Sequence, residues 1–206
     1  MTTATKPLRS PALVCTLSPS PKPSSSQLIA EQVLAKLADA NVTGSVLRVV
    51  DHDVRPGVAA DMGDGDAWPS IRAQVLEADI LVFATPTWMG HMSSVAQRVL
   101  ERLDAEVATQ DEQGRPIMFD KVAVAAVVGN EDGAHKITAD VFQALNDIGY
   151  SIPAQGVTYW NGEAMHGTDY QDLDATPDVV AATTATAAAN AAHLARVLTA
   201  QAYPSG

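Results

Sequence analysis

Apolar residues along the chain follow two alternating patterns. Short and nearly continuous apolar runs occupy residues 12–17, 46–50, 80–84 and 121–128, a pattern typical of parallel strands that are buried on both faces. Elsewhere apolar residues recur every three or four positions, which indicates the buried face of a helix. The expected helices span residues 27–40, 69–77, 93–105, 134–148 and 177–202. A weaker fifth strand is expected at residues 151–156, followed by an aromatic and acidic loop at 157–176.

Strands and helices therefore alternate five times, which predicts an α/β domain with a parallel sheet and helices on both faces. We expect one domain over residues 12–202, preceded by a flexible tail at residues 1–11. The stretch 105–120 is a long excursion between a helix and a strand, and such excursions are often functional or lie at a subunit contact.

Charge and cysteine content narrow the classes of function. The chain has 206 residues, with 13 Lys and Arg against 24 Asp and Glu, a net charge of −11 that disfavours nucleic acid or an anionic membrane as the partner. The single cysteine, Cys15, excludes an internal disulfide and a four-cysteine cluster. The apolar run at 12–17 is too short for a signal-peptide core, and no run approaches the roughly 20 residues of a membrane span. A cytoplasmic location is expected.

Ligands of open parallel sheets bind beyond the carboxyl ends of the strands, so the loops there are the candidate site. The first loop carries Ser18, Ser20, Ser24, Ser25 and Ser26 directly before a helix, with Ser24 and Gln27 spaced as a capping box. A helix N-terminus attracts anions, and serine hydroxyls add neutral donors, which suits a phosphate monoester. The triphosphate loop and the G-x-G-x-x-G dinucleotide fingerprint are both missing. The alternative is a solvated turn with an ordinary helix cap.

The second and third loops offer groups that suit a flat ring. In Pro86, Thr87, Trp88, Met89 and Gly90, an aromatic residue and a methionine could cover a heteroaromatic face. In the third loop, polar backbone groups could read the edge of such a ring; its residues are Gly129, Asn130, Glu131, Asp132 and Gly133. Each loop alone also has a structural explanation, as an edge of the core or as a turn before a helix.

Taken together, the three loops resemble the NAD(P)H-dependent FMN reductase branch of the flavodoxin-like superfamily. The segments that carry the resemblance are Ser18-Pro-Ser with Ser24-Ser-Ser, Pro86-Thr-Trp-Met-Gly, Gly129-Asn-Glu-Asp-Gly-Ala-His and residues 159–170. The likeness covers residues 12–198. It implies a flavodoxin-like three-layer sandwich, with a five-stranded parallel sheet in the order 2-1-3-4-5 and helices on both faces.

The resemblance also implies a non-covalently bound FMN. Its phosphate would be held by Ser18, Ser20, Ser24, Ser25, Ser26 and Gln27. Residues Pro86, Thr87, Trp88, Met89 and Gly90 would run along the ribityl chain and the ring, and residues 129–133 would line the pyrimidine edge or the opposite side of the ring. Where the family commonly has an arginine or a glycine in the first loop, this chain has Pro21, Lys22 and Pro23.

The function that follows is an FMN-dependent oxidoreductase that passes hydride or electrons from NADPH or NADH to a small acceptor such as a quinone or free flavin. No catalytic side chain and no metal site are expected; Asp51, His52 and Asp53 would point to alternate faces of a strand, which is poor ligand geometry. A homodimer or higher homo-oligomer is a family expectation. The alternatives are a flavodoxin-type one-electron carrier without its own NAD(P)H reductase activity, and a cofactor-free scaffold or nucleotide sensor. The acceptor, the choice of nicotinamide and the roles of His135, Trp160 and Tyr170 stay open.

Overall fold

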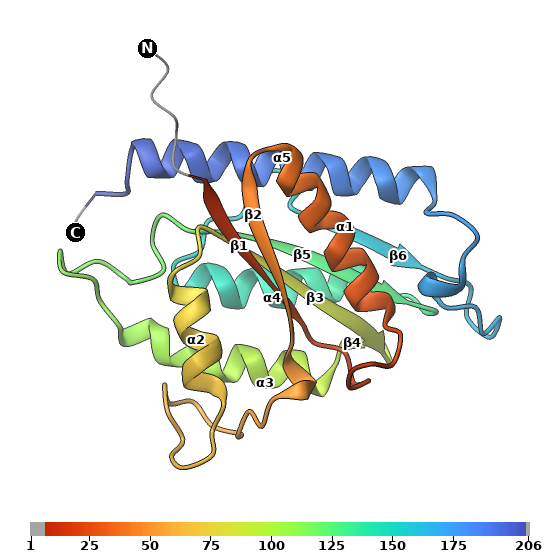
Figure 1. Ribbon diagram of the computed structural model, residues 1–206, viewed down its shortest axis with the longest axis horizontal. Helices are drawn as coiled ribbons and strands as arrows, with labels where there is room; N and C mark the ends of the chain where they lie inside the picture. The colour runs from red at the N-terminus through yellow and green to blue at the C-terminus, as the bar shows by residue number, and fades with distance from the viewer. Residues whose placement is uncertain (1–6, 205–206) are drawn as a thin grey trace.

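A parallel β-sheet runs through the middle of the computed structural model, which describes residues 7–204 (Figure 1). Its strands are β1 (Leu8–Val14), β2 (Val42–Arg48), β3 (Ile80–Trp88), β5 (Val122–Gly129) and β6 (Val157–Asn161), paired in the order β2-β1-β3-β5-β6. A short strand β4 (His91–Met92) pairs antiparallel with the end of β3. Numbered along the chain, the five parallel strands have the order 2-1-3-4-5, which confirms the flavodoxin-like sheet that the resemblance implies.

Helices cover both faces of this sheet (Figure 1). Helices α1 (Ser25–Asp39) and α5 (Asp178–Ala200) lie on one face, and α2 (Trp68–Leu76), α3 (Ser94–Leu103) and α4 (Ala134–Asp147) lie on the other. Successive strand residues point to opposite faces, so Val82 joins the core under α1 and α5 while its neighbour Leu81 joins the core under α2, α3 and α4. The predicted three layers are confirmed.

Strands β1 and β2 begin earlier than their apolar runs predict, at Leu8 and Val42 rather than at residues 12 and 46. Up to Pro11 the first residues of β1 pair only with β2, before β3 joins β1 at Ala12. Arg9, Ser10 and Pro11 interrupt the apolar pattern, so this part of the strand resembles a tail although only Arg9 of the three is exposed. The predicted flexible tail is therefore wrong for residues 8–11, which belong to the sheet, and its residues 1–6 lie outside the described part of the chain.

The fifth strand lies later in the chain than predicted. Of residues 151–156, Ser151 alone forms a bridge, to Val122, whereas the strand itself is β6. Pro153 lacks the backbone N–H that a strand donates. In β6 the buried Thr158 hydroxyl lies 2.9 Å from that of Thr184 on α5, which ties the strand to the helix layer. The aromatic residues at the start of the predicted 157–176 loop therefore belong to the sheet.

The excursion between α3 and β5 folds back on the chain's own C-terminal segment. Arg115 forms ion pairs with Asp111 at 2.8 Å and with Asp120 at 3.0 Å, and it donates to the carbonyl oxygen of Tyr203. The rings of Phe119 and Tyr203 also pack together, with centroids 5.4 Å apart. These contacts anchor the excursion far from the carboxyl ends of the strands.

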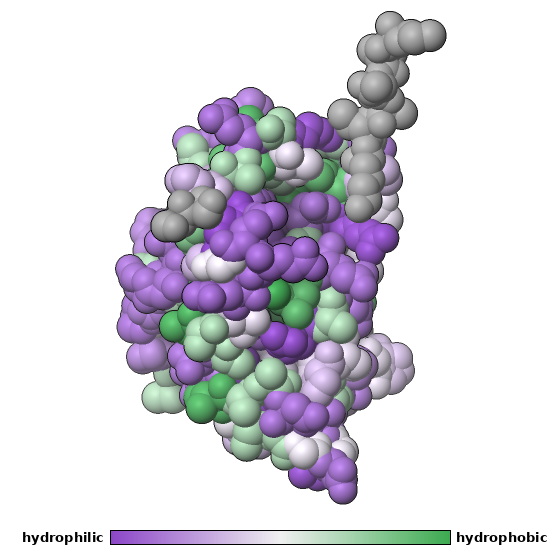
Figure 2. All heavy atoms as spheres, turned by 90° about the vertical axis from the view of Figure 1, so that its left-hand side faces the viewer, coloured by the Kyte–Doolittle hydropathy of each residue, from purple (hydrophilic) through white to green (hydrophobic). Residues whose placement is uncertain are grey.

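The end of the molecule where the strands begin is largely hydrophilic. Figure 2 shows this end, with hydrophobic side chains scattered between hydrophilic ones. Among residues 7–204, no helix combines the length and the apolar character that crossing a membrane requires. The three predicted loops lie at the opposite end, beyond the carboxyl ends of the strands.

Candidate functional site

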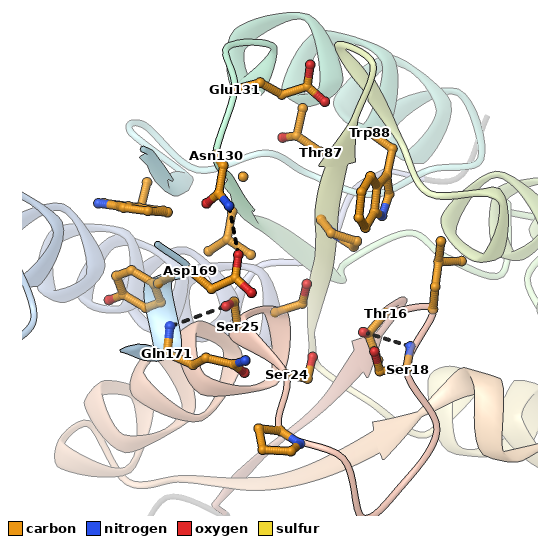
Figure 3. A pocket seen from close by; sticks show the side chains of 18 of the residues that line it. Thr16, Ser18, Ser24, Ser25, Thr87, Trp88, Asn130, Glu131, Asp169 and Gln171 are labelled. Atoms are coloured by element: carbon orange, nitrogen blue, oxygen red, sulfur yellow. Dashed lines mark hydrogen bonds between the residues drawn. The ribbon is translucent and has the colours of Figure 1, made fainter. Parts of the chain in front are cut away.

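A cavity of about 400 Å³ opens where strands β1, β3 and β5 end (Figure 3). This volume is typical of small-molecule sites. All three predicted loops contribute to its wall. The predicted residues that line it are Ser18, Ser24, Ser25, Ser26, Pro86, Thr87, Trp88, Gly129, Asn130 and Glu131. The topology therefore brings together side chains that lie more than a hundred residues apart in the sequence.

Further lining residues come from positions that were not predicted to bind. They are Thr16, Leu17, Pro23, Val128, Trp160, Ala164, Met165, Asp169, Tyr170 and Gln171. Trp160 and Tyr170, whose roles the sequence leaves open, are among them. Residues 160–170 also carry part of the family resemblance, which was the one signal in the sequence that could have located this wall.

The other predicted residues support the loops and do not line the cavity. The N–H and hydroxyl groups of Ser20 donate to the Asp51 carboxylate at 2.8 and 2.6 Å, and these bonds hold the pKa of Asp51 below its usual range. The side chain of Gln27 bridges Arg48 and Glu31. Met89, Gly90, Asp132 and Gly133 form the contact between the second and third loops.

The N-terminus of α1 forms one end of the cavity. Ser24 caps the helix, because its Oγ accepts the N–H of Gln27 at 3.3 Å, which is one half of the predicted capping box. The other half is not formed, because the Gln27 side chain contacts Glu31 and Arg48 instead. The first N–H groups of a helix have no partner within the helix, and Ser24, Ser25 and Ser26 all line the cavity here. This end of the cavity therefore attracts an anion.

Arg48, the last residue of β2, lies beneath the first loop. Its guanidinium donates to the carbonyl oxygens of Ser18 at 3.2 Å and Lys22 at 2.8 Å, and to Oε1 of Gln27 at 2.5 and 2.9 Å. The residue is only 8% exposed. Nothing in the local sequence shows which loop folds over Arg48, so its contact with the site could not be predicted.

The second predicted loop is a tight hairpin. Strand β3 continues to Trp88, and Met89 and Gly90 form a two-residue turn with φ of +52° and +73° before β4. Hairpin turns of this kind need positive φ at both central residues, which glycine adopts freely. The N–H of Met89 donates to the Glu131 carboxylate at 2.5 Å, so the third loop holds the tip of the hairpin.

The hairpin and the third loop also touch backbone to backbone. A Cβ on Gly133 would lie 2.9 Å from Cα of Gly90, and Gly133 has a φ of +146°. The Asp132 carboxylate accepts the N–H of Gly133 at 2.7 Å and the side-chain amide of Asn161 at 3.3 Å. Glycine at position 133 therefore permits the close approach of the third loop to the hairpin.

Residues 169–171, which we call the strap, close the cavity from the side opposite Trp88 (Figure 3). Three bonds fasten it: Asn130 donates to the carboxylate of Asp169 at 2.8 Å, the Tyr170 hydroxyl donates to Gln32 at 2.6 Å, and the N–H of Gln171 donates to Oγ of Ser25 at 3.2 Å. The strap therefore joins the third loop to the N-terminus of α1.

Charge is distributed unevenly along the cavity. Glu131 and Asp169 bring carboxylates to the part formed by the third loop and the strap, and no lysine, arginine or histidine lines the cavity within residues 7–204. The lone cysteine, Cys15, is buried in the core, and burial raises the pKa of its thiol. The wall therefore has no thiolate nucleophile, and the anion-attracting end lies at α1.

Two polar atoms of the wall have no hydrogen-bond partner among the described residues: Oγ1 of Thr87 and Oε1 of Gln171. Buried polar groups nearly always have a partner, so these two unpaired atoms need an explanation. Within residues 7–204, no three His, Cys, Asp or Glu side chains are grouped to hold a metal ion.

The strand order, together with a cavity where that order reverses, defines a flavodoxin-like protein. The model of one family, the NADPH-dependent FMN reductases, matches residues 12–165. The chain belongs to this family of enzymes, as the resemblance predicts.

Two relatives show similarity along most of the chain. The divalent metal cation transporter MntH of Mycobacterium bovis is 36% identical over 169 residues, which make up 80% of this chain and 25% of that protein. An 8-demethyl-8-aminoriboflavin-5'-phosphate synthase of Streptomyces davaonensis is 32% identical over 172 residues, or 79% of this chain and 67% of that protein. The chain thus spans a quarter of the first relative's length and two thirds of the second's.

Solved structures show the same fold. RosB with a bound 8-demethyl-8-formylriboflavin-5'-phosphate intermediate has a TM-score of 0.86 and 31% identity, over 95% of this chain and 82% of that one. An apo NADH:FMN oxidoreductase, EMOB, has a TM-score of 0.63 and 19% identity, over 92% and 89% of the two chains. At its lower identity the second likeness concerns the fold alone.

Proposed function

We propose that this chain binds FMN non-covalently in the cavity and transfers hydride or electrons from NADPH or NADH through it to a small acceptor such as a quinone or free flavin. The observation that carries the proposal is the composition of the wall. An anion-attracting helix end with three serines lies in the same cavity as an indole ring and an unpaired, buried hydroxyl, that of Thr87. Family membership supports the flavin, and the similar RosB is described with a flavin-5'-phosphate compound.

The residues present fit FMN. Ser18, Ser24, Ser25 and Ser26 would hold the phosphate. Pro86, Thr87 and Trp88 would lie along the ribityl chain and the ring, and Gly129, Asn130 and Glu131 would face the ring edge. Ser20, Gln27, Met89, Gly90, Asp132 and Gly133 would hold these groups in place through the contacts described above. Bound FMN supplies the electron-accepting ring, so the side chains need only bind it, orient it and exclude water.

The experiment that tests this function is direct. Purified protein supplied with FMN and then desalted is expected to retain flavin absorbance, and to oxidise NADPH or NADH in the presence of a quinone or free FMN. Loss of all flavin on desalting would overturn the proposal. Retained flavin without NADPH or NADH oxidation would instead favour the one-electron carrier.

A second candidate function is chemical modification of the flavin phosphate itself. It is favoured by the likeness to RosB and to the aminoriboflavin phosphate synthase, whose names concern flavin phosphates altered on the ring. Mass spectrometry of the flavin recovered after turnover distinguishes the two functions. An unchanged mass supports electron transfer, and a changed mass supports modification.

We also propose that the protein is a homodimer whose second copy covers the rim of the cavity. Apolar side chains lie in solvent around this rim: Trp88 is 56% exposed, Met89 86% and Met165 98%. Exposed apolar groups near a site often mark an interface. Sedimentation velocity is expected to give a dimer, and a monomer at micromolar concentration would contradict the proposal.

A further inference from the structure

The first loop has few groups of its own that could balance the charge of a phosphate. Its prolines at positions 19, 21 and 23 have no backbone N–H. The N–H groups of Ser18 and Ser20 are already used, by Oγ1 of Thr16 at 3.2 Å and by the Asp51 carboxylate at 2.8 Å. The one cation of the loop, Lys22, is exposed. The chain carries a net charge of −11, so a bound dianion needs a positive charge from elsewhere.

Arg48 provides a positive charge at this position. Each hydrogen-bond partner of its guanidinium is neutral: the carbonyl oxygens of Ser18 and Lys22 and the amide oxygen of Gln27. No carboxylate of residues 7–204 forms an ion pair with it; Asp51, which feels its charge, is exposed and bound to Ser20. A buried charge is normally paired, so the unneutralised guanidinium calls for an anion.

The position of Arg48 also fits a role in binding the phosphate. Ser18 lines the cavity and accepts a bond from Arg48, and Gln27 lies in the first turn of α1, directly after the three cavity serines. Arg48 therefore fixes the loop and the helix N-terminus relative to each other, on the protein side of the anion-attracting end. Because it is buried, water screens its charge less than it screens that of an exposed lysine.

We propose that Arg48 is the positioning residue for the phosphate monoester of the flavin: it holds the first loop against α1 and supplies the positive charge behind the serines without touching the ligand. This inference rests on the proposed function, because it assumes that a flavin phosphate is the anion. A purely structural strut would behave differently. Neutralising its charge while keeping its bonds to the loop would leave the ratio of FMN to riboflavin affinity unchanged.

Three substitutions and one control separate the effect of the positive charge from that of the support of the loop. Arg48→Met removes both. Gln27→Glu is nearly isosteric and keeps Arg48 with its loop bonds, but turns the amide contact into an ion pair that neutralises the guanidinium. It also loses the bond that the Gln27 amide donates to Glu31 at 2.7 Å. Arg48→Lys keeps the charge without the fork of donors. Lys22→Met is the matched control, because it removes one positive charge from the same loop at an exposed position.

The measurement is titration of each variant with FMN and with riboflavin, which lacks the phosphate. We expect Gln27→Glu to weaken FMN about tenfold and Arg48→Met to weaken it more, with riboflavin changed less than about twofold, because charge-assisted contacts are the strong ones. Arg48→Lys should recover part of the preference for FMN. Lys22→Met should change FMN affinity less than about twofold, because salt screens exposed charges. Inorganic phosphate should raise the Tm of the wild-type apoprotein but not that of Gln27→Glu.

The outcomes separate this inference from the proposed function. A wild type that binds neither flavin overturns both. A wild type that binds FMN, with an unchanged ratio of FMN to riboflavin affinity in Gln27→Glu, overturns the inference alone. Equal losses for both flavins in Arg48→Met and Gln27→Glu also overturn it, since they show a strut only. Gln27→Glu keeps the test decisive even if Arg48→Met fails to fold.

Discussion

Asp66 and Arg102 form an ion pair at 2.7 Å in which neither side chain is exposed to solvent. Arg102 also donates to the carbonyl oxygens of Arg55 and Ala59, and its guanidinium lies 5.6 Å from the ring centroid of Trp68. These contacts fasten the long segment between β2 and α2 to helix α3. The ion pair thus joins the loop to α3, which hydrogen bonds within the loop cannot do.

Replacing Arg102 by methionine is expected to lower the free energy of unfolding by about 3–5 kcal/mol, because it leaves the Asp66 carboxylate buried without its partner. Urea denaturation followed by circular dichroism measures the change. The double variant Asp66→Asn/Arg102→Met should recover part of the loss. An unchanged urea midpoint in Arg102→Met would show that the pair adds nothing to stability.

The same pair predicts a pH dependence of stability. Burial opposes ionisation of Asp66, but hydrogen bonds from Arg102 and from the N–H groups of Met62, Trp68 and Arg55 outweigh it and hold the pKa of Asp66 well below its usual range. A lowered folded-state pKa gives stability that is present above the unfolded value of about 3.9 and is lost as pH falls from there toward the folded value. The gap in unfolding free energy between wild type and Asp66→Asn should therefore be wide at pH 6 and narrower at pH 3. An equal gap at both pH values would contradict this assignment.

The fold could be predicted because its signal is local and repeated. The run at residues 122–128 has a buried side chain at every position. Its continuous apolar pattern therefore predicts that both faces of β5 are buried. Parallel connections then place the following loops at one edge of the sheet. The predicted fifth strand failed where the apolar pattern was weak and Pro153 interrupted it.

The parts of the site that could not be predicted depend on contacts between distant segments. In the sequence, Arg48 is only one polar position in a strand. Its bonds to the first loop exist only in the folded structure. Asp169 and Gln171 meet Asn130 and Ser25 across 39 and 146 residues, and no local spacing encodes such pairs. Hydrogen bonds of this kind leave no trace in hydrophobic periodicity, which reports burial alone.

The double variant Ser25→Ala/Ser26→Ala is expected to weaken FMN binding about tenfold, because each lost neutral hydrogen bond contributes roughly 0.5–1.5 kcal/mol. Removal of Ser25 Oγ also frees the N–H of Gln171, so the strap should loosen as well. Fluorescence titration measures the affinity, and circular dichroism checks that the fold is intact. Ser70→Ala, on α2 away from the cavity, is the control. FMN affinity that stays the same in the double variant would remove the phosphate assignment.

Gly133→Ala should disturb the contact between the hairpin and the third loop. The new Cβ would lie 2.9 Å from Cα of Gly90, and the φ of +146° is strained for any residue with a side chain. We expect a loss of about 1–3 kcal/mol in unfolding free energy, as for overpacking, together with weaker FMN binding. Gly114→Ala is the control, because its φ is +77° but nothing lies within 4 Å of its Cβ. Equal losses in the two variants would show that backbone strain alone, without the clash, explains the effect.

Thr87→Val tests whether the unpaired hydroxyl of the wall serves a ligand. Thr87 is 4% exposed and its Oγ1 has no partner among the described residues, so valine, of the same shape, should leave the free energy of unfolding unchanged or raise it by about 1 kcal/mol. FMN affinity should fall about fivefold to tenfold for the loss of one hydrogen bond.

Thr85→Val, two residues earlier on the same strand, is the matched control. The Oγ1 of Thr85 accepts the N–H of Ser93 at 3.2 Å and donates to the carbonyl oxygen of Pro86 at 3.0 Å. This variant should therefore lose about 1–3 kcal/mol of stability, because the buried N–H of Ser93 is left unpaired. Chemical denaturation and FMN titration of both variants give the comparison. If Thr87→Val lost stability like Thr85→Val and bound FMN like wild type, the hydroxyl would have a structural partner in the protein and no role at the ligand.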